Sequence, residues 1–302
     1  MQKKSGFVSI IGAPNAGKST LLNALVGENL SIVTSKPQTT RNRVFGILTE
    51  ENTQVVFVDT PGILDPRYKL QQYMASEVSD SFEEADVVLV IYDISKDNRS
   101  QLEMIFEKFQ KLILDKKLLL VINKIDCITK EELLIKIGNI TAKFKFDEII
   151  PVSAKKDFNV DELKKVILNL MPEGEFYYNA DVITSQPEKF FVSEIIRQQA
   201  FKMFREEIPF SIFVMINEFK ERERGKDYVN ATIFVERDSQ KGILIGSDGN
   251  MIKTLGEKSR ERIEEFLGRE VYLELFVKVS TNWKDNESFV NKNIKASGKP
   301  AS

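Results

Sequence analysis

One segment, GAPNAGKS (Gly12 to Ser19), constrains the fold of this chain more than any other feature. It follows an apolar run, Phe7–Gly12, and precedes a stretch with helical apolar spacing, Ser19–Leu25. The pattern G-x-x-x-x-G-K-[ST] between a strand and a helix typically forms a phosphate-binding loop, because its glycines let backbone N–H groups face the anion and the helix N-terminus adds partial positive charge. The segment therefore predicts an α/β domain that binds a nucleotide.

The residues of this loop have distinct expected contacts. We expect Lys18 to supply the cation for the β- and γ-phosphate oxygens, and Ser19 to offer its hydroxyl to Mg²⁺. The residues expected to contact the nucleotide here are Gly12, Asn15, Ala16, Gly17, Lys18, Ser19 and Thr20.

A carboxylate and a glycine follow a second long apolar run, in the sequence DTPG. We expect Asp59 to hold Mg²⁺ through water, because Mg²⁺ keeps several waters and binds one or two carboxylates, and the N–H of Gly62 to approach the γ-phosphate. The polar segment SKPQTTRNR is predicted to be a mobile loop that folds over Mg²⁺. Thr40 is the preferred metal hydroxyl, with Thr39 as the alternative. The predicted catalytic residues are Lys18, Thr40 and Gly62.

Two further loops, NKID and SAK, each follow an apolar run. A carboxylate can accept hydrogen bonds from the N1–H and 2-amino groups of guanine, whereas adenine has an acceptor at N1 and no 2-amino group. Asp126 is therefore expected to select guanine by roughly 10⁴-fold, and the Ala154 N–H to meet guanine O6. Asn123 would brace the loops, and the Lys124 stem would cover the ring. The predicted base-binding residues are Asn123, Lys124, Asp126, Ser153, Ala154 and Lys155.

Short apolar runs alternate with amphipathic stretches up to about residue 172, which predicts a doubly wound, mostly parallel sheet of six strands with about five helices. We assign 1–172 to this nucleotide-binding domain. Residues 173–189 contain Gly174 and Pro187 and show neither helical nor alternating periodicity of apolar residues, which predicts a linker. Residues 284–302 are predicted to be a C-terminal tail, disordered at its end, KASGKPAS.

Residues 190–283 have a different pattern, α-β-β-α-α-β, typical of a smaller α+β domain of the KH type II fold. The segment IGSDGNMI fits I-G-x-x-G-x-x-I, expected between a strand and a helix, where KH loops clamp single-stranded nucleic acid. Ser247 and Asp248 stand where such loops usually carry Lys or Arg, and Asp248 opposes phosphate. The predicted RNA-binding residues are Ile245, Gly246, Ser247, Gly249, Ile252 and Lys253.

Composition excludes several classes of site. The chain has no histidine, so histidine acid–base catalysis and histidine-ligated zinc are excluded. The single cysteine, Cys127, cannot form an internal disulfide. A formal net charge of −2 predicts no global cationic surface, so any nucleic-acid site must be local.

The motifs GAPNAGKS, QTTR, DTPGI, NKID and SAK resemble those of the translation-factor-like branch of P-loop GTPases, over about residues 5 to 172. With the KH-like domain and the closing VYLELFVKVSTNWKD, almost the whole chain is similar to the Era family of bacterial GTPases. This resemblance implies GTP or GDP and Mg²⁺ as ligands, binding to 16S ribosomal RNA near its 3′ end, and a role in 30S subunit maturation. It also implies partial peripheral contact with the inner membrane; we expect a cytoplasmic monomer.

Intrinsic hydrolysis is expected to be slow, with the missing polar group supplied by another residue, a bound cation or a partner. GTPases of the Ras type place a water-orienting glutamine after DTPG, but here that position is Ile63. Similar GTPases suggest that Asn15 helps bind K⁺; the alternative is that Asn15 only shapes the loop.

Two other functions are compatible with part of the sequence. In one, the GTP switch acts on a protein or membrane partner and the KH-like domain is a docking module, which Asp248 favours. The other, a metabolic P-loop kinase, conflicts with the guanine-selecting loops.

Overall fold

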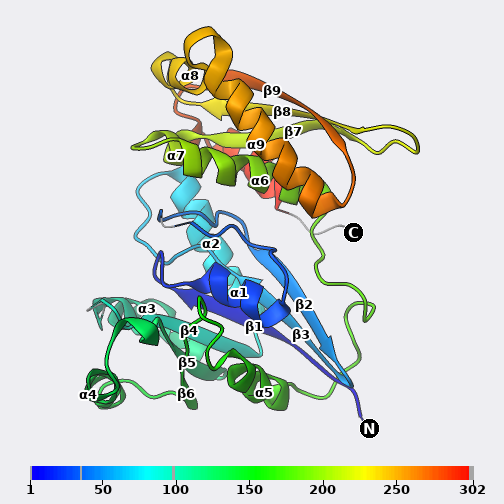
Figure 1. Ribbon diagram of the computed structural model, residues 1–302. Coiled ribbons are helices and arrows are strands. Elements are labelled where there is room, and N and C mark those ends of the chain that lie inside the picture. The colour runs from blue at the N-terminus through cyan, green and yellow to red at the C-terminus, as the bar shows by residue number, and fades with distance from the viewer. Residues whose placement is uncertain (1, 35, 97–98, 299–302) are drawn as a thin grey trace. The chain divides into compact units, whose positions relative to one another are not determined.

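The computed structural model describes residues 2–34, 36–96 and 99–298 (Figure 1). The chain forms two compact units. The first comprises Met1–Arg67 with Gln71–Ser185, and the second comprises Tyr68–Leu70 with Gln186–Ser302. The division between them lies at Ser185, inside the predicted linker.

The first unit is a six-stranded sheet in the order β2-β3-β1-β4-β5-β6. Only β2 is antiparallel to its neighbour, β3; the other pairings are parallel. The predicted doubly wound fold is therefore confirmed, and the carboxyl ends of the parallel strands meet at one edge, where such folds bind ligands. The strands are β1 Lys4–Gly12, β2 Val44–Glu50, β3 Thr53–Asp59, β4 Val87–Asp93, β5 Lys117–Asn123 and β6 Glu148–Pro151.

Helices cover both faces of this sheet (Figure 1). α1 and α5 contact each other and β3 on one face. On the other, apolar side chains from α2, α3 and α4 join β4 and β5 in one core, where Phe82 and Phe109 stack at 4.4 Å. Every residue of β4 is buried, which explains its continuous apolar run. The helices are α1 Lys18–Val26, α2 Lys69–Glu84, α3 Arg99–Ile113, α4 Lys130–Thr141 and α5 Val160–Leu170.

The predicted linker binds the first unit along much of its length. Gln54, fully buried, donates to Tyr178 O at 2.9 Å and accepts from Tyr178 N at 3.0 Å. Ile47 N donates to Ile183 O at 2.8 Å, so the edge strand β2 gains a backbone partner. Covering a sheet edge in this way protects it from pairing with other chains. Local sequence contains no periodic signal for such a contact.

The second unit has a three-stranded sheet, β7-β8-β9, with β7 antiparallel and β9 parallel to β8. Apolar side chains of α6, α8 and α9 pack on one face of it. The predicted α-β-β-α-α-β order is confirmed, except that a short helix, α7 Ile208–Ser211, occupies the predicted start of the first strand, where Pro209 favours a helix N-terminus. The other elements are α6 Glu188–Met203, β7 Phe213–Lys220, β8 Asp227–Val235, α8 Asp238–Ile245, α9 Asn250–Leu267 and β9 Val271–Val279.

Two expectations about the second unit were wrong. The IGSDG loop joins α8 to α9 and does not follow a strand. The C-terminal residues up to Gly298 are folded: Trp283 is fully buried and donates its Nε1–H to Ser211 O at 3.0 Å, which anchors the segment that follows. That segment comprises the turn Trp283–Asp285, α10 Glu287–Phe289 and a π-helical stretch, Val290–Lys295. The rest of the predicted disordered end, 299–302, lies outside the described residues.

No helix within residues 2–34, 36–96 and 99–298 is both long enough and apolar enough to span a bilayer.

Candidate nucleotide and nucleic-acid sites

The phosphate loop connects β1 to α1. Lys18 is buried, and its ammonium donates to Gly12 O at 3.2 Å and Ala13 O at 2.9 Å. Burial lowers the pKa of Lys18 to about 8, while the carboxylate of Asp59 acts in the opposite direction. A buried ammonium that donates to two backbone carbonyls is suited to receive phosphate oxygens.

Gly17 shows why a glycine is needed immediately before the lysine. Its φ is 104°, and a Cβ there would lie 2.2 Å from Asn123 Nδ2. Any side chain would therefore push the phosphate loop away from the NKID loop.

Three oxygen-bearing side chains converge beside this loop. Ser19 Oγ donates to Asp59 Oδ2 at 2.7 Å and lies 3.1 Å from Thr40 Oγ1, which is itself 3.4 Å from Asp59 Oδ2. Asp59 is fully buried, and burial raises its pKa. Within the part of the chain that the structure describes, Asp59 Oδ1 has no hydrogen-bond partner.

This constellation fits Mg²⁺. Two hydroxyls and one carboxylate, of which one buried oxygen has no hydrogen-bond partner among the described residues, match a hard cation that completes its shell with water and phosphate. No cluster of three or more Asp, Glu or Cys side chains suitable for a metal occurs among the described residues. A cation here would thus depend on phosphate oxygens as well as on the protein.

The DTPG loop lies directly against the phosphate loop. A Cβ on Gly62 would lie 2.8 Å from the Cα and N of Pro14, and Ile63 N donates to Gly12 O at 3.1 Å. The Ile63 side chain packs against the core on the α2–α3–α4 face of the sheet. The position that carries glutamine in Ras-type GTPases therefore contributes a hydrophobic contact here.

The base-reading loops are tied to the phosphate loop by Asn123. Its Nδ2 donates to Ala16 O at 2.8 Å, and its Oδ1 accepts from Lys124 N at 2.8 Å and Ala154 N at 3.0 Å. The Ala154 N–H expected at guanine O6 is thus directed to a side-chain oxygen in this structure. Sequence alone could not reveal this partner, because the two residues lie on different loops.

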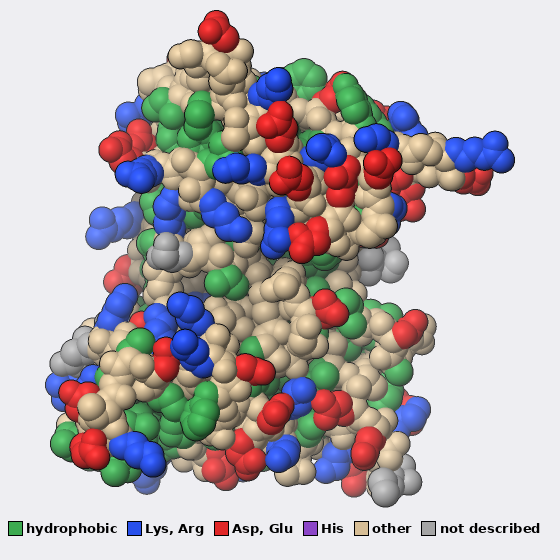
Figure 2. All heavy atoms as spheres, viewed as in Figure 1, with side chains coloured by type: hydrophobic (Ala, Val, Ile, Leu, Met, Phe, Trp, Pro, Cys, Tyr) green, Lys and Arg blue, Asp and Glu red, His purple; other side chains and the backbone are tan. Residues whose placement is uncertain are grey.

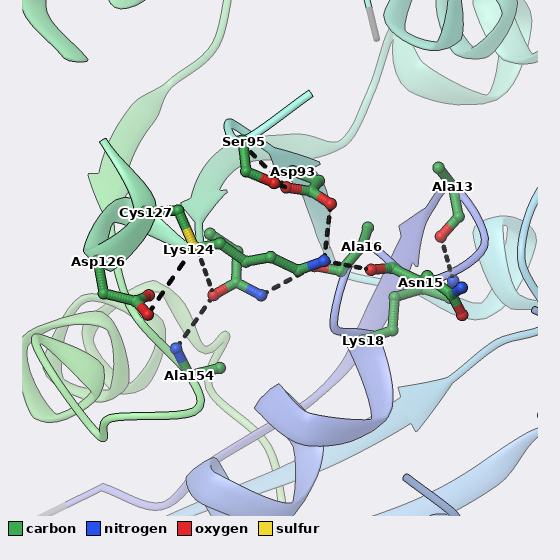
Figure 3. A network of polar contacts seen from close by, with 11 residues as sticks. Ala13, Asn15, Ala16, Lys18, Asp93, Ser95, Lys124, Asp126, Cys127 and Ala154 are labelled. Atoms are coloured by element: carbon green, nitrogen blue, oxygen red, sulfur yellow. Dashed lines mark hydrogen bonds and ion pairs between the residues drawn. The ribbon is translucent and has the colours of Figure 1, made fainter. Parts of the chain in front are cut away.

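Lys124 bridges the same loops. Its ammonium contacts Asn15 O and Asp93 Oδ2, both at 2.7 Å, and Asp93 Oδ1 accepts from Ser95 Oγ at 2.5 Å (Figure 3). These contacts hold the alkyl stem of Lys124 across the site. Asp93 is the last residue of β4, and Ser95 lies two residues after it. Neither residue was predicted, although their position at the carboxyl end of a parallel strand could have indicated a role in the site.

Asp126 is exposed, as a base-reading carboxylate should be. Ser153 Oγ donates to its Oδ1 at 2.6 Å, and this hydrogen bond lowers the pKa of Asp126. The carboxylate is therefore ionised at neutral pH and oriented by a neighbouring loop.

A cavity of about 500 Å³ joins these loops. Gly12, Ala16, Asp59 and Ala154 lie behind its surface, whereas the other predicted residues line it. The predicted lining residues are Asn15, Gly17, Lys18, Ser19, Thr20, Thr39, Thr40, Gly62, Asn123, Lys124, Asp126, Ser153 and Lys155. Sequence reasoning missed Pro14, Ile32, Val33, Thr34, Gln38, Lys96 and Cys127.

The IGSDG loop of the second unit lies directly before α9. Gly246 has φ 72° and ψ 178°, and a Cβ there would lie 2.5 Å from Met251 Cγ. Gly249 has φ 75°, and a Cβ there would have Ile252 Cγ2 as its nearest neighbour at 4.0 Å, an ordinary van der Waals contact. Ser247 and Asp248 are exposed. The loop thus presents an exposed polar surface at the N-terminus of an 18-residue helix.

Charges near this loop are mixed. Lys253 and Lys258 are exposed, but Arg260 is paired with Glu264 at 3.0 Å. The visible face of the second unit carries both signs interspersed (Figure 2). Ile252 packs against the core beneath the loop, so its main role in this structure is hydrophobic.

Comparisons with known proteins identify both domains. Residues 7–124 match the family model described as 50S ribosome-binding GTPase, and residues 207–284 match the KH domain model. GTPase Era of Geobacter sp. (strain M21) is 46% identical over 283 residues, covering 94% of this chain and 95% of that protein. The chain belongs to the Era family of GTPases. Era of Heliobacterium modesticaldum is 44% identical over 93% of each chain.

Solved Era structures have the same fold. A crystal structure of Era in complex with MgGDPNP and nucleotides 1506–1542 of 16S ribosomal RNA matches with a TM-score of 0.92 and 42% identity, covering 96% of this chain and 98% of that one. An Aquifex aeolicus Era variant bound to GDP and AlF₄⁻ matches with a TM-score of 0.90 and 41% identity, covering 95% and 98%. As a member of the Era family, this chain is a P-loop GTP hydrolase with a C-terminal KH domain.

Proposed function

We propose that this GTPase binds the 3′ region of 16S ribosomal RNA through its KH domain and assists maturation of the 30S subunit, with GTP and GDP setting its binding state. The observation that carries the proposal is the strained, exposed loop from Gly246 to Gly249 at the start of α9. Its glycines permit close approach of a phosphate backbone, and the helix N-terminus favours negative charge. An Era structure containing a 16S fragment supports the choice of RNA.

In the nucleotide site, the proposed roles follow the geometry. Lys18 binds the β- and γ-phosphates, the Gly62 N–H meets the γ-phosphate, and Asp126 reads guanine. Ser19 and Thr40 bind Mg²⁺ directly, and Asp59 binds it through water. When bound, Mg²⁺ neutralises charge on the phosphate oxygens.

The test is fluorescence anisotropy of a short single-stranded RNA that matches the 3′ end of 16S rRNA, with the full chain loaded with GDP or a non-hydrolysable GTP analogue. We expect tighter binding in the GTP form. Asp248→Asn should tighten binding roughly threefold to tenfold, since it removes one negative charge near phosphate and asparagine tolerates the φ of 53°.

The matched control is Asp157→Asn. Asp157 is also exposed and has φ 54°, but it lies in the first unit. It should leave RNA affinity unchanged. Absence of RNA binding in either nucleotide form, by wild type and by Asp248→Asn, would contradict the proposal. The docking-module alternative, which Asp248 motivates, would then be favoured.

A monovalent cation is proposed as an aid to hydrolysis. Asn15 has φ 63° and lines the cavity, and Ile63 contributes no polar group there. K⁺ held beside Asn15 would supply positive charge to the phosphates. Turnover should therefore be faster in KCl than in NaCl, and equal rates in wild type would contradict this role.

The remaining expectations concern the location and the oligomeric state of the protein. A cytoplasmic location, a monomeric state and partial peripheral contact with the inner membrane stay predictions.

A further inference from the structure

We infer that Glu77 is a positioning residue, which holds the loop carrying Thr40 in its metal-binding position through contacts from α2. The inference rests on the proposed role of Thr40 at Mg²⁺. It adds a residue outside every nucleotide-binding motif.

The contacts come from one face of α2. Tyr73, Glu77 and Glu84 are spaced by four and seven residues, which places them on the same side of a helix. Tyr73 donates its hydroxyl to Asn42 Oδ1 at 2.8 Å. Glu77 Oε2 accepts from both the backbone N and the Nε of Arg43, each at 3.3 Å.

The contacts are sheltered from water. Tyr73, Glu77 and Asn42 are each no more than 9% exposed. Arg43 is also paired with Glu84 at 2.7 Å, and its guanidinium lies over the ring of Phe45. Sheltered, charge-assisted hydrogen bonds are screened less than surface pairs, so they can restrain a loop.

Their position matters for Thr40. Asn42 lies two residues after Thr40, and two residues span at most about 7 Å. Fixing Asn42 and Arg43 on α2 therefore restricts Thr40, whose Oγ1 lies 3.1 Å from Ser19 Oγ. The GTP-bound state requires this placement more than the GDP-bound state, because the loop is expected to close when the γ-phosphate is present.

The electrostatics keep the contacts formed near neutral pH. Burial, followed by the charge of Glu77, raises the pKa of Tyr73, so its hydroxyl retains the proton that it donates. Burial would lower the pKa of Arg43, but Glu84, Glu77 and Asp80 raise it overall, so the guanidinium stays charged.

The experiment measures release of fluorescent GDP and of a fluorescent non-hydrolysable GTP analogue from the full chain in Mg²⁺. Thr40→Ala is the reference for loss of the metal hydroxyl. We expect Glu77→Gln to speed release of the GTP analogue roughly tenfold, the equivalent of one charge-assisted hydrogen bond, and GDP release less than twofold. Tyr73→Phe should act in the same direction.

Glu83→Gln is the matched control, since Glu83 is an exposed glutamate of the same helix. It lies about 100° around α2 from the face that carries Tyr73, Glu77 and Glu84. Glu83→Gln should change neither rate. Equal acceleration of both nucleotides by Glu77→Gln would indicate general loosening and overturn the inference. An unchanged Glu77→Gln beside a fast Thr40→Ala would overturn only the inference, whereas an unchanged Thr40→Ala would remove the proposed role of Thr40 and the inference with it.

Discussion

At the scale of single residues, the burial of Lys18 has a direct consequence for nucleotide binding. Its ammonium is buried against two backbone carbonyls, and its pKa is lowered to about 8 because burial disfavours the charge. Phosphate binding would restore the charge. The favourable electrostatic interaction of Lys18 is therefore formed only when the nucleotide binds.

A pH dependence of binding follows from Lys18. Above pH 8 the empty site holds a neutral lysine, which must take up a proton when phosphates bind, so affinity should fall as pH rises through 8. We expect the Kd for GDP to rise roughly threefold between pH 7.5 and 8.5. Titration calorimetry at several pH values measures it. Guanosine, which lacks phosphate, should show no such change in competition, and a flat GDP profile would contradict the prediction.

At the scale of elements, the loop between α8 and α9 contains two glycines with different constraints. Gly246 combines φ 72° with ψ 178°, a region that glycine alone occupies readily, and a close neighbour in Met251. Gly249 adopts an ordinary left-handed conformation, and a Cβ there would make only an ordinary van der Waals contact, with Ile252 Cγ2 at 4.0 Å. A side chain at Gly249 would therefore add backbone strain, whereas a side chain at Gly246 would add both backbone strain and a steric clash with Met251.

We predict that Gly246→Ala destabilises the second unit by about 2–3 kcal/mol and Gly249→Ala by about 1 kcal/mol, since only the first adds a clash to the backbone strain. Trp283, the single tryptophan, is buried in this unit, so its fluorescence during denaturant unfolding reports on it. Equal losses for both variants would show that the loop relaxes around Met251.

At the scale of the whole molecule, charge limits how RNA can be recognised. A formal net charge of −2 gives no overall attraction to a polyanion. Binding is expected to use a few cations of α8 and α9, such as Lys241, Lys253 and Lys258, beside acidic neighbours.

The salt dependence of RNA binding should therefore be shallow. With about three phosphate contacts to a single strand, log K against log [KCl] should have a slope of about −2. Anisotropy titrations at several KCl concentrations measure this slope. A slope steeper than about −4 would reveal a broader cationic surface than these lysines provide.

Much of the nucleotide site could be predicted because its residues are contiguous in sequence. The segments Gly12–Ser19 and Asn123–Asp126 are each continuous in the sequence, so spacing and residue type define their chemistry before folding. The alternation of apolar runs and amphipathic stretches likewise predicted the sheet, since strands buried on both faces require continuous apolar runs.

What the sequence determined by itself was thus the class of fold, the order of the loops and the preference for guanine. Only the tertiary structure decided three hydrogen bonds: from Ala154 N to Asn123, from Tyr178 N to Gln54, and from Arg43 Nε to Glu77. These partners lie 31, 124 and 34 residues apart. Such pairings depend on how whole elements pack, which no local spacing encodes.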